Sequence, residues 1–158
     1  MKQEQKLRNQ LAELLLNGHA FTPLETILAG ITVAEAGKRV AGLPYTLWKL
    51  IEHLRITLND ILEFSRDPAY QSPGWPQGYW PAADKPASQA GLDASIRAIA
   101  LDLKAMVQLI KDPARDLFEP FAHGEGQNLL REALLVTEHN AYHLGQILVL
   151  RRLLGTWE

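Results

Sequence analysis

Cysteine is absent from the 158-residue chain, and its absence excludes several kinds of chemistry. Without thiols the protein has no disulfide, no thiolate metal ligand and no cysteine nucleophile. Any thiol chemistry therefore requires a thiol brought in by a small molecule.

The sequence also lacks a strong charge of one sign and a long apolar run. It has 18 acidic and 16 basic residues, a net charge of −2, and no run of Lys and Arg. Such a chain attracts neither nucleic acid nor anionic lipid. No apolar run reaches about 18 residues, and the polar start "MKQEQKLRNQ" lacks the apolar core of a signal peptide. We therefore expect a cytoplasmic protein that binds neither nucleic acid nor membranes.

No segment alternates with the period of two that a strand requires, whereas apolar residues recur at helical spacing throughout. Hydrophobic residues at 47% and charged residues at 22% are typical of a globular chain, and the length fits a single domain over 1–158. Long helices are predicted over 3–17, 44–66, 88–110 and 127–154. Two shorter helical turns are expected, one capped by Thr22 with Pro23 and Glu25 following, and one within 32–40. The pattern predicts an all-α four-helix bundle.

The segment "DPAYQSPGWPQGYWPAADKP" separates the second and third long helices. It has about 20 residues, far more than a tight helix–helix turn needs. At about 3.3 Å per extended residue it can return the chain along a helix of roughly 30 Å. This aromatic and proline-rich crossover makes the middle helices parallel, in an up-down-down-up bundle. Its aromatic residues need cover from water, so the segment is either an apolar strap or a pocket rim formed by Trp75, Tyr79 and Trp80.

Two histidines lie four residues apart in "EHNAYHLGQ", on an otherwise apolar helical stripe. Residues at this spacing project from one face, so His139 and His143 can reach one ion. His53 is the candidate third ligand, provided that the second and last long helices touch. Three imidazoles with open positions suit zinc, nickel, iron or a similar divalent metal in a catalytic-type site. The alternative is that the rings are only packed and hydrogen-bonded. His19 and His123 are predicted to be non-ligands.

Four polar residues near these histidines are candidates for contacts with a ligand ring or a substrate. Glu52 and Glu138 each precede a histidine and point about 100° away from it, which favours solvent-facing or interhelical positions over orienting a ligand. Asn140 and Gln146 can hydrogen-bond a ligand ring, a water or a substrate, or bridge helices. None has the character of a strong base, so the sequence identifies no catalytic residue.

The segments "LWKLIEHLR", "GWPQGYWP" and "REALLVTEHNAYHLGQILVLRRLLG" resemble the DinB/YfiT-like superfamily of four-helix bundles. The resemblance covers nearly the whole chain and is most specific in "HNAYHLGQ". It implies an up-down-down-up bundle, a homodimer, and a divalent metal held by His53, His139 and His143. Other members of the wider superfamily are transferases and isomerases that use a low-molecular-weight thiol.

Three hypotheses about function follow from these residues and this resemblance. The first is a metal-dependent transferase that activates a small thiol. The second is a metal-dependent hydrolase in which the metal activates water. The third is a non-catalytic metal-binding dimer, in which the imidazoles join two helices.

Overall fold

The chain forms helices joined by turns and loops in the computed structural model, which describes residues 2–158. Four long helices are present: α1 (Lys2–Asn17), α4 (Leu47–Arg66), α5 (Gln89–Lys111) and α6 (Leu129–Leu153). Three short elements are α2 (Leu24–Leu28), α3 (Val33–Ala36) and the 3₁₀ turn η1 (Gln77–Tyr79). No strand occurs in residues 2–158, where Pro120 and Asn128 form an isolated bridge. The all-α prediction is confirmed.

The helix ends follow local capping chemistry. Side chains cap the starts of the last three long helices by accepting a backbone N–H: Thr46 for α4, Ser88 for α5 and Asn128 for α6. The second and last long helices therefore begin at 47 and 129, slightly later than expected. The prediction that Thr22 caps a helix was wrong. Pro23 is extended at the N-cap of α2 with no side-chain cap, and the capping box forms instead at Thr32 and Glu35.

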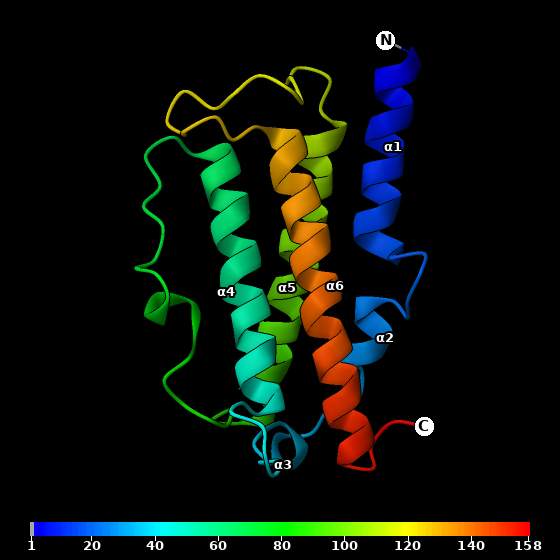
Figure 1. The fold of residues 1–158 in the computed structure, drawn as a ribbon, viewed down its shortest axis with the longest axis vertical. Helices are drawn as coiled ribbons and strands as arrows, with labels where there is room; N and C mark the ends of the chain where they lie inside the picture. The colour runs from blue at the N-terminus through cyan, green and yellow to red at the C-terminus, as the bar shows by residue number, and fades with distance from the viewer. Residues whose placement is uncertain (1) are drawn as a thin grey trace.

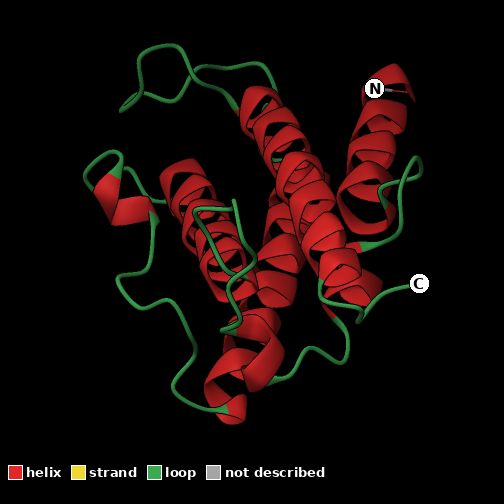
Figure 2. Ribbon diagram, turned by 60° about the horizontal axis from the view of Figure 1, so that its bottom comes forward, coloured by secondary structure: helices red, strands yellow, loops and turns green. Residues whose placement is uncertain are grey.

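Figure 1 shows the four long helices side by side, with α4 and α5 running in one direction and α1 and α6 in the other. The second view, Figure 2, shows that the connections run around the ends and the outside of these helices. α4 packs against both α5 and α6, and α1 packs against the same two helices. This packing places the face of α4 that carries His53 beside α6.

Apolar side chains on the inward faces of the long helices form the core. Examples with no more than 1% of their surface exposed are Leu50, Leu54, Leu58 and Leu62 of α4, Ile99, Met106 and Ile110 of α5, and Val136, Ile147 and Leu150 of α6. Their three- and four-residue spacing is the helical period read from the sequence. Over residues 2–158, no helix has both the length and the apolar character required to traverse a bilayer.

The connection between α4 and α5, residues 67–88, runs alongside α4 from one end to the other (Figure 1). We call it the connecting segment. The Thr46 hydroxyl donates to the backbone carbonyl of Asp84 at 2.7 Å, and Trp80 packs against the core. Trp75 is 79% exposed, so the expectation that all the aromatic residues of this segment are covered was wrong for this one. The segment is attached to the bundle through some of its aromatic side chains and leaves Trp75 at the surface.

Candidate metal centre

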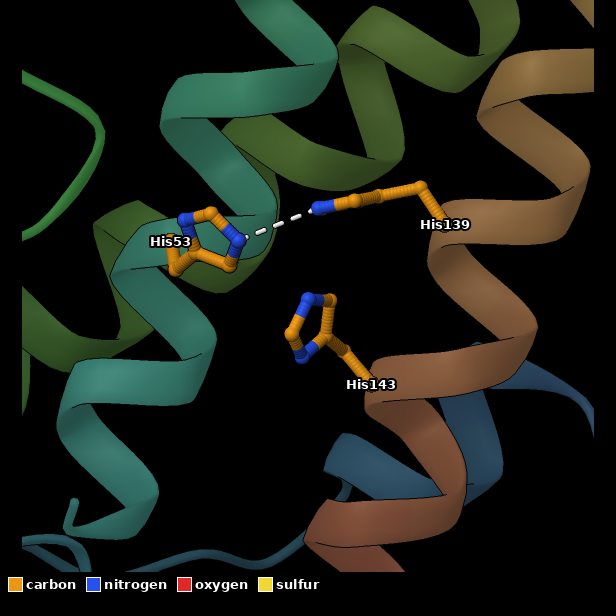
Figure 3. Close-up of side chains that lie close together, drawn as sticks. All are labelled: His53, His139 and His143. Atoms are coloured by element: carbon orange, nitrogen blue, oxygen red, sulfur yellow. Dashed lines mark hydrogen bonds between the residues drawn. The ribbon is translucent and has the colours of Figure 1, made fainter. Parts of the chain in front are cut away.

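Three histidine rings from two helices converge at one point between α4 and α6 (Figure 3). His53 comes from α4, whereas His139 and His143 lie one turn apart on α6. Each ring offers a nitrogen, and the three nitrogens lie within 4.8 Å of one another. Nε2 of His53 and Nε2 of His139 are 3.1 Å apart. The structure thus brings together the three histidines predicted from the sequence.

In two of these rings, the nitrogen that faces away from the cluster makes a hydrogen bond to an oxygen acceptor. Nδ1 of His53 donates to the backbone carbonyl oxygen of Tyr79 at 2.8 Å, and Nδ1 of His143 donates to Oε1 of Gln146 at 2.7 Å. We assign the protons to Nδ1 because both partners are oxygen acceptors. Nε2 of each ring therefore presents a lone pair to the centre of the cluster, as an imidazole ligand requires.

Aromatic stacking adds a second constraint on His53. The indole of Trp80 lies parallel to the imidazole, with ring centroids 4.0 Å apart and an angle of 3° between the planes. Tyr79 and Trp80 are neighbours in the connecting segment, so one short stretch both orients the ring of His53 and covers one of its faces.

Burial keeps the three rings neutral at physiological pH. Loss of hydration, together with the neighbouring His143 and His53, lowers the pKa of His139 to about 3. Burial also lowers the pKa of His53 and of His143, against the opposing effect of the acceptors Tyr79 and Gln146. Neutral imidazole is the form that binds a metal, so proton competition at this site is weak.

The separation of one nitrogen pair in the cluster fits a shared divalent cation. Two nitrogens at about 2.0–2.1 Å from one ion, with an angle of roughly 90–110° between them, lie about 3 Å apart. The observed 3.1 Å between His53 and His139 agrees with this separation. In the absence of an ion, one of these two Nε2 atoms must carry a proton for the contact to be favourable. A shared cation removes that requirement and uses all three lone pairs.

An open pocket of about 830 Å³ adjoins the cluster, and all three histidines line it. Five aromatic side chains form much of the rest of its wall: Tyr45, Trp75, Tyr79, Trp80 and Tyr142. Burial and the hydrogen bond to Asp60 raise the pKa of Tyr79 to about 12, so its hydroxyl remains a donor. A small molecule that enters this pocket can therefore contact the three histidines.

The other predicted site residues divide into two groups. Glu138 and Gln146 line the pocket together with Trp75, Tyr79 and Trp80. Asn140 and Glu52 do not belong to its lining. Asn140 is buried beside a small separate cavity near α1, and Glu52 is buried and paired with Arg55 at 2.9 Å. Nε2 of His123 donates to the backbone carbonyl oxygen of Phe64, and neither His123 nor His19 is part of the cluster.

Several residues of the pocket were not singled out from the sequence. Thr57 and Asp60 follow His53 at positions i+4 and i+7, a spacing that puts them on the same face of α4 and could have revealed them. Tyr45 and Tyr142 line the pocket without a comparable signal. The acceptor role of the Tyr79 carbonyl could not be read from any residue type, because it belongs to the backbone.

Comparison with known families agrees with this geometry. A family model described as the DinB superfamily matches residues 20–147, a range that includes all three clustered histidines. No curated protein and no solved structure has a significant match to the chain.

Proposed function

The chain belongs to the DinB superfamily, and from this premise we propose that it binds a divalent metal through His53, His139 and His143 and uses it to activate a low-molecular-weight thiol for transfer to a small substrate. The convergence of three neutral imidazoles beside an open pocket is the observation that carries the proposal. Zinc, nickel and iron all suit these ligands.

We further propose the architecture that accompanies this function in the family. Residues 1–158 form one domain, an up-down-down-up four-helix bundle whose crossover is the connecting segment. The protein acts as a cytoplasmic homodimer. Exposed apolar side chains along α6 support a partner surface: Leu134, Tyr142, Val149 and Leu153.

The residues of this chain have separable roles in the proposed reaction. When bound, a divalent ion lowers the pKa of a thiol or water, so that the ionised form persists near neutral pH. The Tyr79 carbonyl and Gln146 hold His53 and His143 with their Nε2 lone pairs directed inward. Trp80 shields one face of His53 from water. The aromatic wall binds the apolar part of a substrate and keeps it beside the histidines.

Conjugation of the electrophile monochlorobimane with a panel of small bacterial thiols tests the proposal. We expect fluorescence to develop in the presence of protein, metal and one of the thiols, and to stop when a chelator removes the metal. Turnover of ester or amide substrates that needs metal but no thiol would instead identify a hydrolase. A large fall in melting temperature on chelation, with no turnover in either assay, would identify a non-catalytic metal-binding protein.

Replacing Gln146 by alanine is expected to weaken metal binding roughly 10–100-fold, because His143 loses the acceptor that fixes its orientation. Competition with a chromophoric chelator measures this change. Gln146→Glu keeps an acceptor oxygen and is expected to retain the affinity. Gln108→Ala, which removes an exposed glutamine from α5, is the matched control. Wild-type affinity in Gln146→Ala would show that the hydrogen bond to His143 does not support the site.

A further inference from the structure

The pocket beside the histidine cluster is acidic as well as aromatic. Among the described residues that line it, Asp60 and Glu138 carry negative charge, and none is Lys or Arg. The chain as a whole has nearly equal numbers of acidic and basic residues, so this lining differs from the average composition. The protein's own side chains in this pocket therefore favour cationic ligands, whether a metal ion at the histidines or an ammonium group.

Asp60 is the acidic residue placed deepest in this wall. Only 8% of its surface is exposed, and it lies two turns beyond His53 on the same face of α4. Its Oδ2 accepts a hydrogen bond from the Tyr79 hydroxyl at 2.8 Å. Its Oδ1 is buried and has no hydrogen-bond partner in residues 2–158. The Tyr70 hydroxyl lies close enough for Asp60 to raise its pKa, yet no donor from the described part of the chain meets Oδ1 in hydrogen-bonding geometry. A buried carboxylate oxygen without a donor is destabilising, so this side of Asp60 lacks a partner that it requires.

Thr57, one turn before Asp60 on α4, also has a buried polar atom without a partner in residues 2–158. Its Oγ1 is also buried without a hydrogen-bond partner in the described chain, and it lines the same pocket. His53, Thr57 and Asp60 therefore form a row along one helix face, in which the last two residues offer unused acceptor atoms. Two adjacent acceptors without donors point to a ligand that brings N–H groups of its own.

The aromatic side chains around this row narrow the class of ligand. Trp75, Tyr79 and Tyr142 form part of the pocket wall. Ring faces attract cations, and they also bind the apolar body of a ligand. A carboxylate that shares a pocket with aromatic rings therefore suits an ammonium group.

We propose that the pocket binds a protonated amine carried on an apolar body, with the ammonium group at Asp60 and Thr57 and the body between the aromatic side chains. The carboxylate turns toward the pocket as the ligand enters, because Oδ1 is covered in its absence. The amine is thereby held on the same face of α4 as His53. Any reaction of the bound amine rests on the proposed metal-dependent function. The binding of the amine itself does not require the metal.

A pair of probes that differ mainly in charge tests the inference. 2-Phenylethylamine is protonated near neutral pH, and 2-phenylethanol has a similar shape without the charge. Titration calorimetry on the purified protein is expected to give the amine an affinity about tenfold higher than that of the alcohol, as one charged hydrogen-bonded contact provides. Equal affinities for the two probes would overturn the proposal without reference to any variant.

Asp60→Asn tests recognition of the amine without removing the hydrogen-bond acceptor of the Tyr79 hydroxyl. The asparagine side chain keeps an oxygen that can accept from Tyr79 but loses the charge. We expect amine affinity to fall about tenfold to that of the alcohol, while metal content and melting temperature stay near wild type. Glu138→Gln removes the exposed acidic residue of the same pocket and is the matched control, with a loss below about threefold. An equal loss in both variants would overturn the assignment to Asp60.

His139→Ala distinguishes failure of this inference from failure of the proposed function. If the amine nitrogen binds the metal rather than Asp60, this variant loses the amine and Asp60→Asn keeps it, which overturns the inference. If the protein contains no metal but still prefers the amine through Asp60, the inference stands and the metal-based function fails.

Discussion

Replacing His139 by alanine is expected to remove the metal from the purified protein. His139 supplies one of the three converging nitrogens, and its ring is the one whose pKa burial lowers to about 3. Loss of an outer hydrogen-bond partner alone weakens metal sites roughly 10–100-fold, so loss of a ligand is expected to cost more than about a hundredfold. Elemental analysis of the protein as purified, followed by titration with zinc and nickel, measures the effect.

His123→Ala provides the control for this experiment. His123 contacts the Phe64 carbonyl and is not part of the cluster, so its replacement is expected to leave the metal content at the wild-type value. His53→Ala and His143→Ala are expected to behave like His139→Ala, because each of these rings also supplies one of the three nitrogens and no single helix supplies all of them. Stoichiometric metal in any of these three variants would show that the corresponding residue is not a ligand.

The features that could be predicted from the sequence are those fixed by helix geometry. A spacing of four residues puts His139 and His143 on one face in any α-helix, and the apolar stripe around them sets which face turns inward. The ends of the helices could also be predicted from the residues around them. α1 ends at Asn17, before a glycine whose φ of 67° suits the left-handed region, and α4 and α5 end just before Asp67-Pro68 and Asp112-Pro113.

The meeting of His53 with the other two histidines was not fixed by spacing. It depends on the packing of α4 against α6, and periodicity shows that a helix has a buried face without showing which helix covers it. The family resemblance supplied that pairing. The three-histidine cluster was therefore predicted by combining a local rule with a similarity that covers most of the chain.

The contacts of the connecting segment were the least predictable part of the site. Its irregular backbone places the Tyr79 carbonyl on His53 and leaves Trp75 exposed, and no periodic pattern determines either outcome. The buried position of Asp60 was present in the helical period of α4 as the seventh residue after His53. It was overlooked because an acidic residue is usually exposed to solvent.

Acidification is expected to destabilise the metal-free protein steeply, because the histidine cluster is neutral when folded and protonated when unfolded. In the unfolded chain the three histidines titrate near their ordinary pKa of about 6.5. In the folded chain burial lowers the pKa of each ring, to about 3 for His139. Between those values the unfolded state binds more protons, so the free energy of unfolding falls as the pH falls. Above about pH 7.5 both states are neutral at these rings, and their contribution is constant.

Urea denaturation in the presence of a chelator, between about pH 7.5 and 5.5, measures this dependence above the ordinary pKa range of carboxylates. Each histidine that stays neutral in the folded state contributes a slope of up to about 1.4 kcal/mol per pH unit. His139→Gln removes one titrating ring and is expected to reduce the slope by up to that amount. A slope that His139→Gln leaves unchanged would mean that His139 is protonated equally in both states, and that its ring is not held neutral by the fold. Weak proton competition would then no longer favour metal binding at this centre.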